Sequence, residues 1–163
     1  MKLTVELSRK SIRQAIQQLE RYKKSLDEKC ELLCQKLAEI GVDAAVATVS
    51  VETGELKDSI RFEKSNDKEY LVIVENDHAA LVEFGTGVVG QGTYPGELPA
   101  GWGYDERRTP AAHDPIDPTT WYYNDKFGTR RKTRGQTANA YMLAGAEEMR
   151  QSILSVAKEV FGE

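Results

Sequence analysis

A single helical stripe of apolar residues runs through the first third of the chain. From residue 8 onward, apolar side chains recur at steps of three and four, which places them on one face of an α-helix, and Ser8 offers an N-cap. A break is expected near residues 21–25, where the stripe lapses, or at Gly41. Packing within the molecule is favoured over a free coiled coil. The stripe consists of Ile12, Ile16, Leu19, Leu26, Cys30, Leu33, Leu37, Ile40, Ala44 and Ala47.

Short apolar runs on both sides of this helix predict β-strands. Before it, apolar and polar residues alternate over residues 2–7. After it, turn signals at 52–54, 65–68 and 76–77 separate a lead-in at 55–64, an apolar run at 70–74 and a third run at 78–84. Because turns this short favour antiparallel neighbours, the three segments predict a β-meander.

Residues 85–136 differ in composition from the rest of the chain. They hold all five prolines, nine of the 13 glycines and seven of the 13 aromatic residues, which is typical of a long functional loop. Within them, Trp121, Tyr122 and Tyr123, a turn at 124–128 and an extended run at 129–133 predict a hairpin that extends the sheet or projects from it. A final helix is expected at about 141–161, with Gly162 as its stop.

Together these elements predict one α+β domain over residues 1–163. The long N-terminal helix and the C-terminal helix are expected to pack on one face of an antiparallel β-sheet. Residues 86–134 form a long aromatic, Gly/Pro-rich loop or hairpin insertion in this scheme. The open sheet edge and the aromatic loop are then the expected contacts between copies.

Composition and charge narrow the class of protein. The chain has 29% charged residues and a net charge of −4, so a surface that binds nucleic acid everywhere is disfavoured. No apolar run approaches the ~18 residues of a membrane span, and residues 1–9 lack the pattern of a secretory signal. Synthesis in a cytoplasm, without membrane contact, is expected. Cys30 and Cys34, four apart on a helix, predict buried or half-buried thiols and no disulfide.

Residues suited to catalysis are few. His113 lies near Asp114 and Asp117, but this spacing does not indicate a metal site, and an Asp before proline is a turn former. For Glu83, a structural salt bridge or a backbone-capping role is favoured over catalysis. The glycines at 85–92 lack the Lys-Ser/Thr of a phosphate-binding loop. No catalytic residue, metal or cofactor is predicted, and a hydrolase that combines His78 or His113 with Glu83 is the weakest alternative.

The sharpest charge feature follows the aromatic run of the hairpin. Residues 99–136 carry seven cations and five acids, while the rest of the chain is net negative. Three uses stay open: a solvated hairpin edge that discourages strand pairing, contact with nucleic acid, and docking onto an acidic protein. The candidate contact residues are Trp121, Tyr122, Tyr123, Arg130, Arg131, Lys132 and Arg134.

Three short motifs resemble a known family. The run Thr53-Gly54-Glu55-Leu56-Lys57-Asp58-Ser59-Ile60 resembles a T-G-x-L-x-x-S-I signature, and the run Ala79-Ala80-Leu81-Val82-Glu83-Phe84-Gly85-Thr86 resembles an A-x-x-V-E-F-G-T strand. Gly135 to Met142 is similar to G-Q-x-A-x-P-F-M/L, with Ala140 in place of proline and Tyr141 in place of phenylalanine. The family that shares these motifs consists of phage tail components, typified by gene product ten of phage Hong Kong 97.

The resemblance implies a structural role for the motif residues. Turn geometry is expected at Gly54 and Gly85, and core positions at Leu56, Ile60, Val82 and Phe84. Family members are virion or assembly proteins of the head–tail junction or tail top, so the resemblance implies a tail-completion subunit that forms ring-like homo-oligomers beside other neck or tail proteins. DNA in the lumen is a further expected contact, and a nucleic-acid-binding module using 130–134 is the alternative. The motif residues are Thr53, Gly54, Leu56, Ser59, Ile60, Val82, Glu83, Phe84, Gly85 and Thr86.

Overall fold

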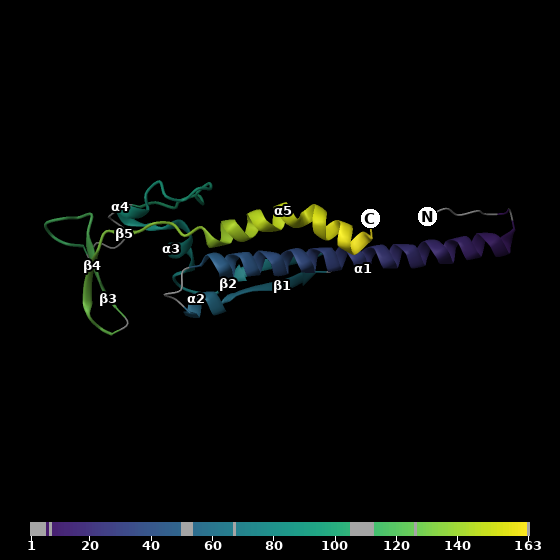
Figure 1. Ribbon diagram of the computed structural model, residues 1–163, viewed down its shortest axis with the longest axis horizontal. Coiled ribbons are helices and arrows are strands. Elements are labelled where there is room, and N and C mark those ends of the chain that lie inside the picture. The colour runs from purple at the N-terminus through teal and green to yellow at the C-terminus, as the bar shows by residue number, and fades with distance from the viewer. Residues whose placement is uncertain are drawn as a thin grey trace.

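The computed structural model shows an elongated molecule built around one long helix (Figure 1). It describes residue 6 and residues 8–49, 54–66, 68–104, 113–125 and 127–162. The predicted strand at 2–7 and the motif residue Thr53 lie outside these residues.

Helix α1 (Arg9–Thr48) is continuous over 40 residues, so the predicted break is wrong. Ser8 is its N-cap, as predicted, and its hydroxyl oxygen accepts a hydrogen bond from the Ser11 amide at 3.2 Å. Gly41 does not break the helix because it serves a close contact. A Cβ at this position would lie 2.7 Å from the sulfur of Met149, on the C-terminal helix.

Helix α5 (Tyr141–Phe161) has the bounds that its apolar pattern predicts, and it lies along one side of α1 (Figure 1). Its Gly145 approaches α1 so closely that a Cβ would lie 2.6 Å from the carbonyl oxygen of Gly41. Small residues on both helices therefore permit this approach of the two backbones. At the other end, Gly162 takes a left-handed conformation (φ 80°) and stops the helix.

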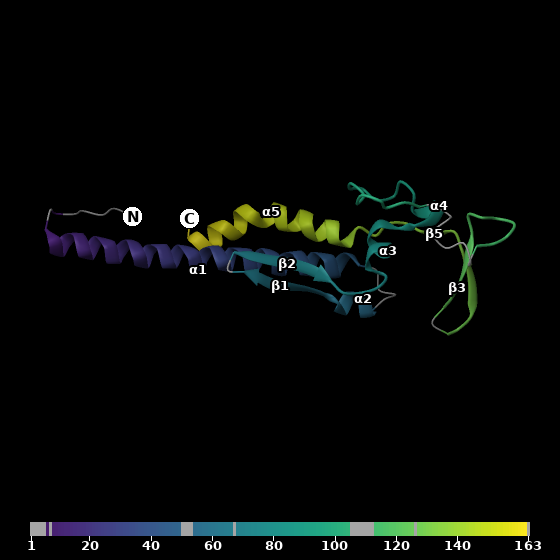
Figure 2. The ribbon, with the colours of Figure 1, turned by 180° about the vertical axis from the view of Figure 1, so that it is seen from behind.

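Strands β1 (Ile60–Asn66) and β2 (Glu69–Val74) form an antiparallel hairpin beside α1 (Figure 2). Directly paired residues share a face, and the Ile60–Val74 pair belongs to the core. Ion pairs from Lys64 to Glu31 (2.6 Å) and from Lys68 to Asp27 (3.1 Å) join the hairpin to α1. The α+β class is confirmed, but α5 packs chiefly on α1 and not on the sheet.

The predicted third strand is wrong, because residues 79–84 form the helix α3 (Ala79–Phe84). Asn76 turns the chain out of the sheet: its carbonyl oxygen accepts from the Ala79 amide and its side-chain oxygen accepts from the His78 amide. Ala79 and Glu83 are the buried residues of α3, which is the i, i+4 spacing of a helix. Among the residues that the structure describes, the first sheet therefore has two strands and is no meander.

The segment before β1 departs from the prediction, whereas the aromatic hairpin agrees with it. The lead-in before β1 is the short helix α2 (Gly54–Asp58). The aromatic hairpin is confirmed as β3 (Trp121–Asn124) and β4 (Arg130–Thr133), paired antiparallel in a sheet of its own. It projects at one end of the molecule, next to the helix α4 (Gly87–Gly90) and the strand β5 (Gly135–Gln136) (Figure 1).

Candidate functional site

Glu83 joins the second motif to the third. Its buried carboxylate accepts hydrogen bonds from the backbone amides of Met142 (2.8 Å) and Leu143 (3.1 Å), in the first turn of α5, and from the hydroxyl of Tyr94 (3.3 Å). A carboxylate at a helix N-terminus satisfies amides that have no partner within the helix and meets the positive end of the helix dipole. The predicted backbone-capping role of Glu83 is thus confirmed.

Glycines allow two chain segments to cross at this joint. Gly85 has φ 77°, and a Cβ there would lie 2.7 Å from the Ala138 amide nitrogen. Gly135 has φ 109°, and a Cβ there would lie 1.9 Å from the carbonyl oxygen of Thr86. Both positions require glycine on two counts, conformation and space. The Thr86 hydroxyl oxygen accepts from the Gln136 amide at 3.2 Å, which completes the crossing.

The first motif supplies the core rather than a reactive site. Leu56 and Ile60 are buried in the central cluster, as predicted, and the Ser59 hydroxyl donates to the Leu56 carbonyl oxygen at 2.7 Å. Gly54 does not need its expected turn geometry, because its φ is not positive and a Cβ there would meet nothing within 4 Å. Val82 is partly buried against the same cluster.

An open, largely apolar groove of about 590 Å³ lies beside the Glu83 joint. Burial, followed by the nearby Glu83 charge, raises the pKa of Tyr94, and the same causes raise the pKa of Tyr141 to about 12. A tyrosine held protonated in this way is a poor base, and neither His78 nor His113 lines the groove. The arrangement gives Glu83 no histidine partner, which opposes the hydrolase alternative. The lining residues are Val74, Asn76, Asp77, Ala79, Ala80, Glu83, Phe84, Tyr94, Tyr141, Met142, Leu143 and Ala146.

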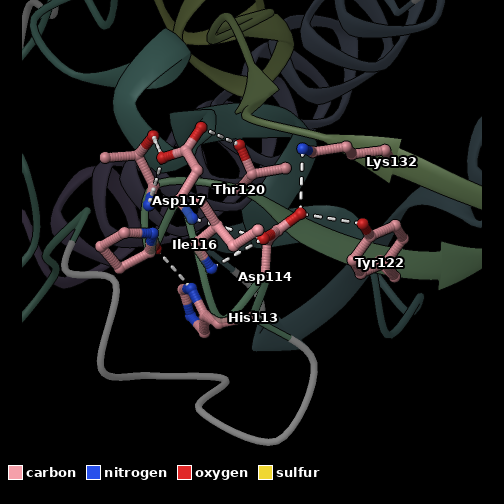
Figure 3. A network of polar contacts seen from close by, with 9 residues as sticks. His113, Asp114, Ile116, Asp117, Thr120, Tyr122 and Lys132 are labelled. Carbon is pink, nitrogen blue, oxygen red and sulfur yellow. Dashed lines mark hydrogen bonds and ion pairs between the residues drawn. The ribbon is translucent and has the colours of Figure 1, made fainter.

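Asp114 organises the approach to the projecting hairpin (Figure 3). Its carboxylate accepts from the Ile116 amide (2.9 Å), the Tyr122 hydroxyl (2.8 Å) and the Lys132 ammonium (2.9 Å). These donors hold the pKa of Asp114 well below its usual range, with the Ile116 amide as the largest cause. Asp117 similarly accepts from Thr119 and Thr120. Both aspartates are turn formers, as predicted.

The three cations of strand β4 have partners within the hairpin region. Arg130 lies over the Tyr122 ring, 4.4 Å from its centroid, and Arg131 pairs with Asp125 at 3.0 Å. Lys132 pairs with Asp114. Two of the four cations at 130–134 are thus paired with a carboxylate. The exposed apolar side chains of the hairpin lie elsewhere, at Phe127 in the turn (80% exposed) and at Tyr123.

A second exposed apolar surface lies at the opposite end of the molecule. We define residues 9–26 as the projecting segment of α1, because α5 ends where Phe161 meets Lys29 and the β1–β2 hairpin ends at the Lys68–Asp27 pair. Figure 2 shows this segment extending beyond both elements. The interpretation that the whole stripe packs within the molecule is wrong here. The apolar stripe in the sequence is the signal that could have identified this surface. Its exposed members are Ile12, Ile16, Leu19 and Leu26.

The described residues bear on two other functions, metal binding and insertion into a membrane. They contain no group of three or more His, Cys, Asp or Glu side chains arranged to hold a metal ion. Among the same residues, none of the helices is long and apolar enough to cross a membrane. Cys30 and Cys34 are both half-buried and unbridged, as predicted.

One stretch of the chain matches a family of phage tail components. This stretch includes the first motif and, except for Thr86, the second motif. Residues 13–85 match the family described as "Bacteriophage HK97-gp10, putative tail-component". The match confirms the resemblance drawn from the motifs, whereas the third motif lies beyond the matched stretch. Comparison with curated proteins and with solved structures gave no match.

Proposed function

We propose that this chain is a structural subunit of the head–tail junction or tail top of a tailed phage or prophage, where it completes the tail without catalysing a reaction. The observation that carries the proposal is the family match over residues 13–85, combined with apolar side chains exposed at both ends of an elongated molecule. A subunit that acts by contact with neighbours needs such surfaces. In the virion it sits among copies of itself, in a ring, and beside other neck or tail proteins.

The hairpin end is the surface that we assign to the adjoining neck or tail protein. Phe127 and Tyr123 expose rigid rings there, and aromatic side chains of this kind anchor protein interfaces. The Asp114 network fixes the turn that leads into β3, so the rings are presented on a rigid support.

A phage that encodes this chain tests the proposal. Phe127→Ser and Tyr123→Ser should leave the fold intact, because both side chains are exposed, but should yield separate heads and tails in electron micrographs. Leu154→Ser is the matched control, since Leu154 is 67% exposed on α5, away from the hairpin. Full-titre virions with joined heads and tails for both hairpin variants contradict the proposal.

Contact with DNA in the lumen stays a prediction. Arg130, Arg131 and Lys132 would have to exchange their present partners for phosphates, so a weak and strongly salt-dependent affinity is expected. A filter-binding titration with duplex DNA at several salt concentrations measures it. The absence of binding at low salt removes the nucleic-acid alternative.

A further inference from the structure

The projecting segment of α1 is apolar along one face and strongly basic elsewhere. Ile12, Ile16 and Leu19 expose 43%, 50% and 51% of their surface. Residues 9–26 hold six cations and one acid, a net charge of +5, although the whole chain is at −4. A helix with an uncovered apolar stripe between cationic flanks fits a surface that is apolar and acidic.

The outward face of the β1–β2 hairpin has that character. The strand register places Arg61 opposite Ile73 and Glu63 opposite Leu71, on the face away from the buried Ile60–Val74 pair. Leu71 is 46% exposed. Arg61 contacts both Glu63 (2.8 Å) and Glu75 (3.0 Å), so two carboxylates share one guanidinium and this face is net acidic.

The distribution of charge along the chain also sets a basic projecting segment against an acidic region that contains the hairpin. Residues 27–80, which include the hairpin and the packed part of α1, hold 13 acids and six cations, a net charge of −7. The inner face of the hairpin is already covered by α1. A helix against the outer face would bury the sheet on both sides, which is a stable layer arrangement.

We propose that the projecting segment of one copy packs across the outward face of the β1–β2 hairpin of a second copy. Charge selects this occupant, because pairing two projecting segments would bring +5 against +5, whereas the outward face of the hairpin is net acidic and lies within a stretch, residues 27–80, whose net charge is −7. The contact is heterologous, so a pair of copies keeps one unused helix and one unused sheet face, and repetition gives a ring or an open array. This deepens the self-association in the proposed function by assigning it two surfaces.

Sedimentation velocity of the full chain at millimolar concentration tests the contact. The wild type should self-associate, and more weakly as salt rises, because the attraction is partly ionic. Ile12→Gln/Ile16→Gln/Leu19→Gln, the stripe variant, and Leu71→Arg, the face variant, should each weaken association at least about tenfold. Leu154→Gln, an exposed apolar residue outside both surfaces, should leave it unchanged. Circular dichroism checks that every variant is folded.

Mixing the two variants separates this contact from its alternatives. The stripe variant keeps an intact sheet face and the face variant keeps an intact helix, so a 1:1 mixture should form a dimer that neither forms alone and that does not grow further. Association of the face variant at wild-type strength would mean that helices pair with each other, and it overturns the proposal. So does a wild type that stays monomeric, or one whose stripe acts only on anionic phosphatidylserine vesicles or duplex DNA. None of these readouts depends on virion assembly, so failure here is distinct from failure of the proposed function.

Discussion

The two parts of helix α1 share one apolar period but have opposite fates. In the packed part, residues 27–48, most of the stripe is half-buried. The fully buried positions there are the small residues Ala38, Gly41 and Ala45 beside the stripe, which let α5 approach the backbone. In the projecting segment, the stripe consists of large side chains such as Ile16 and Leu19, and these are exposed. Apolar periodicity therefore does not show which part of a helix is covered within the molecule, whereas small residues beside the stripe mark where a partner helix can lie close.

The largest effect is expected where the packed part meets α5. Gly145→Val should lower the free energy of unfolding by about 2–3 kcal/mol, because its Cβ must displace the Gly41 carbonyl, which is backbone and cannot rotate away. Urea denaturation measures the change. Gly54→Ala is the control, since a Cβ there meets nothing within 4 Å and the change should stay below about 0.5 kcal/mol. Equal effects of the two substitutions would show that the helix crossing is not tight.

The next largest loss of stability is expected from a change to Glu83, whose carboxylate caps the start of α5. Glu83→Gln should cost about 1–2 kcal/mol, because one amide oxygen cannot replace two charged oxygens that accept from Met142, Leu143 and Tyr94. Glu148→Gln, on the exposed side of the same helix, should be close to neutral. Amide hydrogen exchange should also show faster exchange at Met142 and Leu143 in the Glu83 variant alone. Unchanged protection there speaks against the cap.

A smaller effect, of opposite sign, is expected one residue before α5. Ala140 has φ 54°, a left-handed conformation that costs an alanine about 1 kcal/mol more than a glycine. Ala140→Gly should therefore raise the free energy of unfolding by about 1 kcal/mol, whereas Ala47→Gly within α1 should lower it by a similar amount. Thermal denaturation distinguishes the two signs. Destabilisation by both glycines would contradict the left-handed start.

The smallest effect on stability is expected in the projecting segment. Ile16→Gln should change the free energy of unfolding by less than about 0.5 kcal/mol in dilute solution, where association does not contribute. Leu56→Gln, at a fully buried position, should cost about 3 kcal/mol or more. If Ile16→Gln proved as damaging as Leu56→Gln, the stripe would have to be covered within the molecule, and the contrast between the two parts of α1 would fail.

Local signals were sufficient for several elements. Capping residues and the apolar period predict Ser8 as a helix cap, the bounds of α5 and the stop at Gly162. The aromatic run and the turn after it predict the β3–β4 hairpin. For Glu83, the sequence left a salt bridge and a backbone-capping role open, and the structure shows the cap.

Other features depend on contacts between distant segments and were mispredicted. An apolar run of six residues fits a strand or a helix, and the Asn76 turn decides for the helix α3. Gly41 is compatible with a break or with a close helix crossing, and only Gly145, more than 100 residues later, distinguishes them. The ion pairs of the basic hairpin were not anticipated, because Asp114 and Asp125 could not be matched to Lys132 and Arg131 from sequence alone.

Because α1 is uninterrupted, its first 18 residues move as one rigid rod that, within the described part of the chain, is held only where α1 packs on α5 and the sheet. At ~1.5 Å per residue the rod is roughly 27 Å long, so a tilt of about 10° at its held end swings its tip by roughly 5 Å, close to one helical pitch. Small adjustments in the core are in this way magnified at the tip. In the ring proposed above, a small change of packing at the junction with α5 would therefore shift the point at which the tip meets a neighbouring copy.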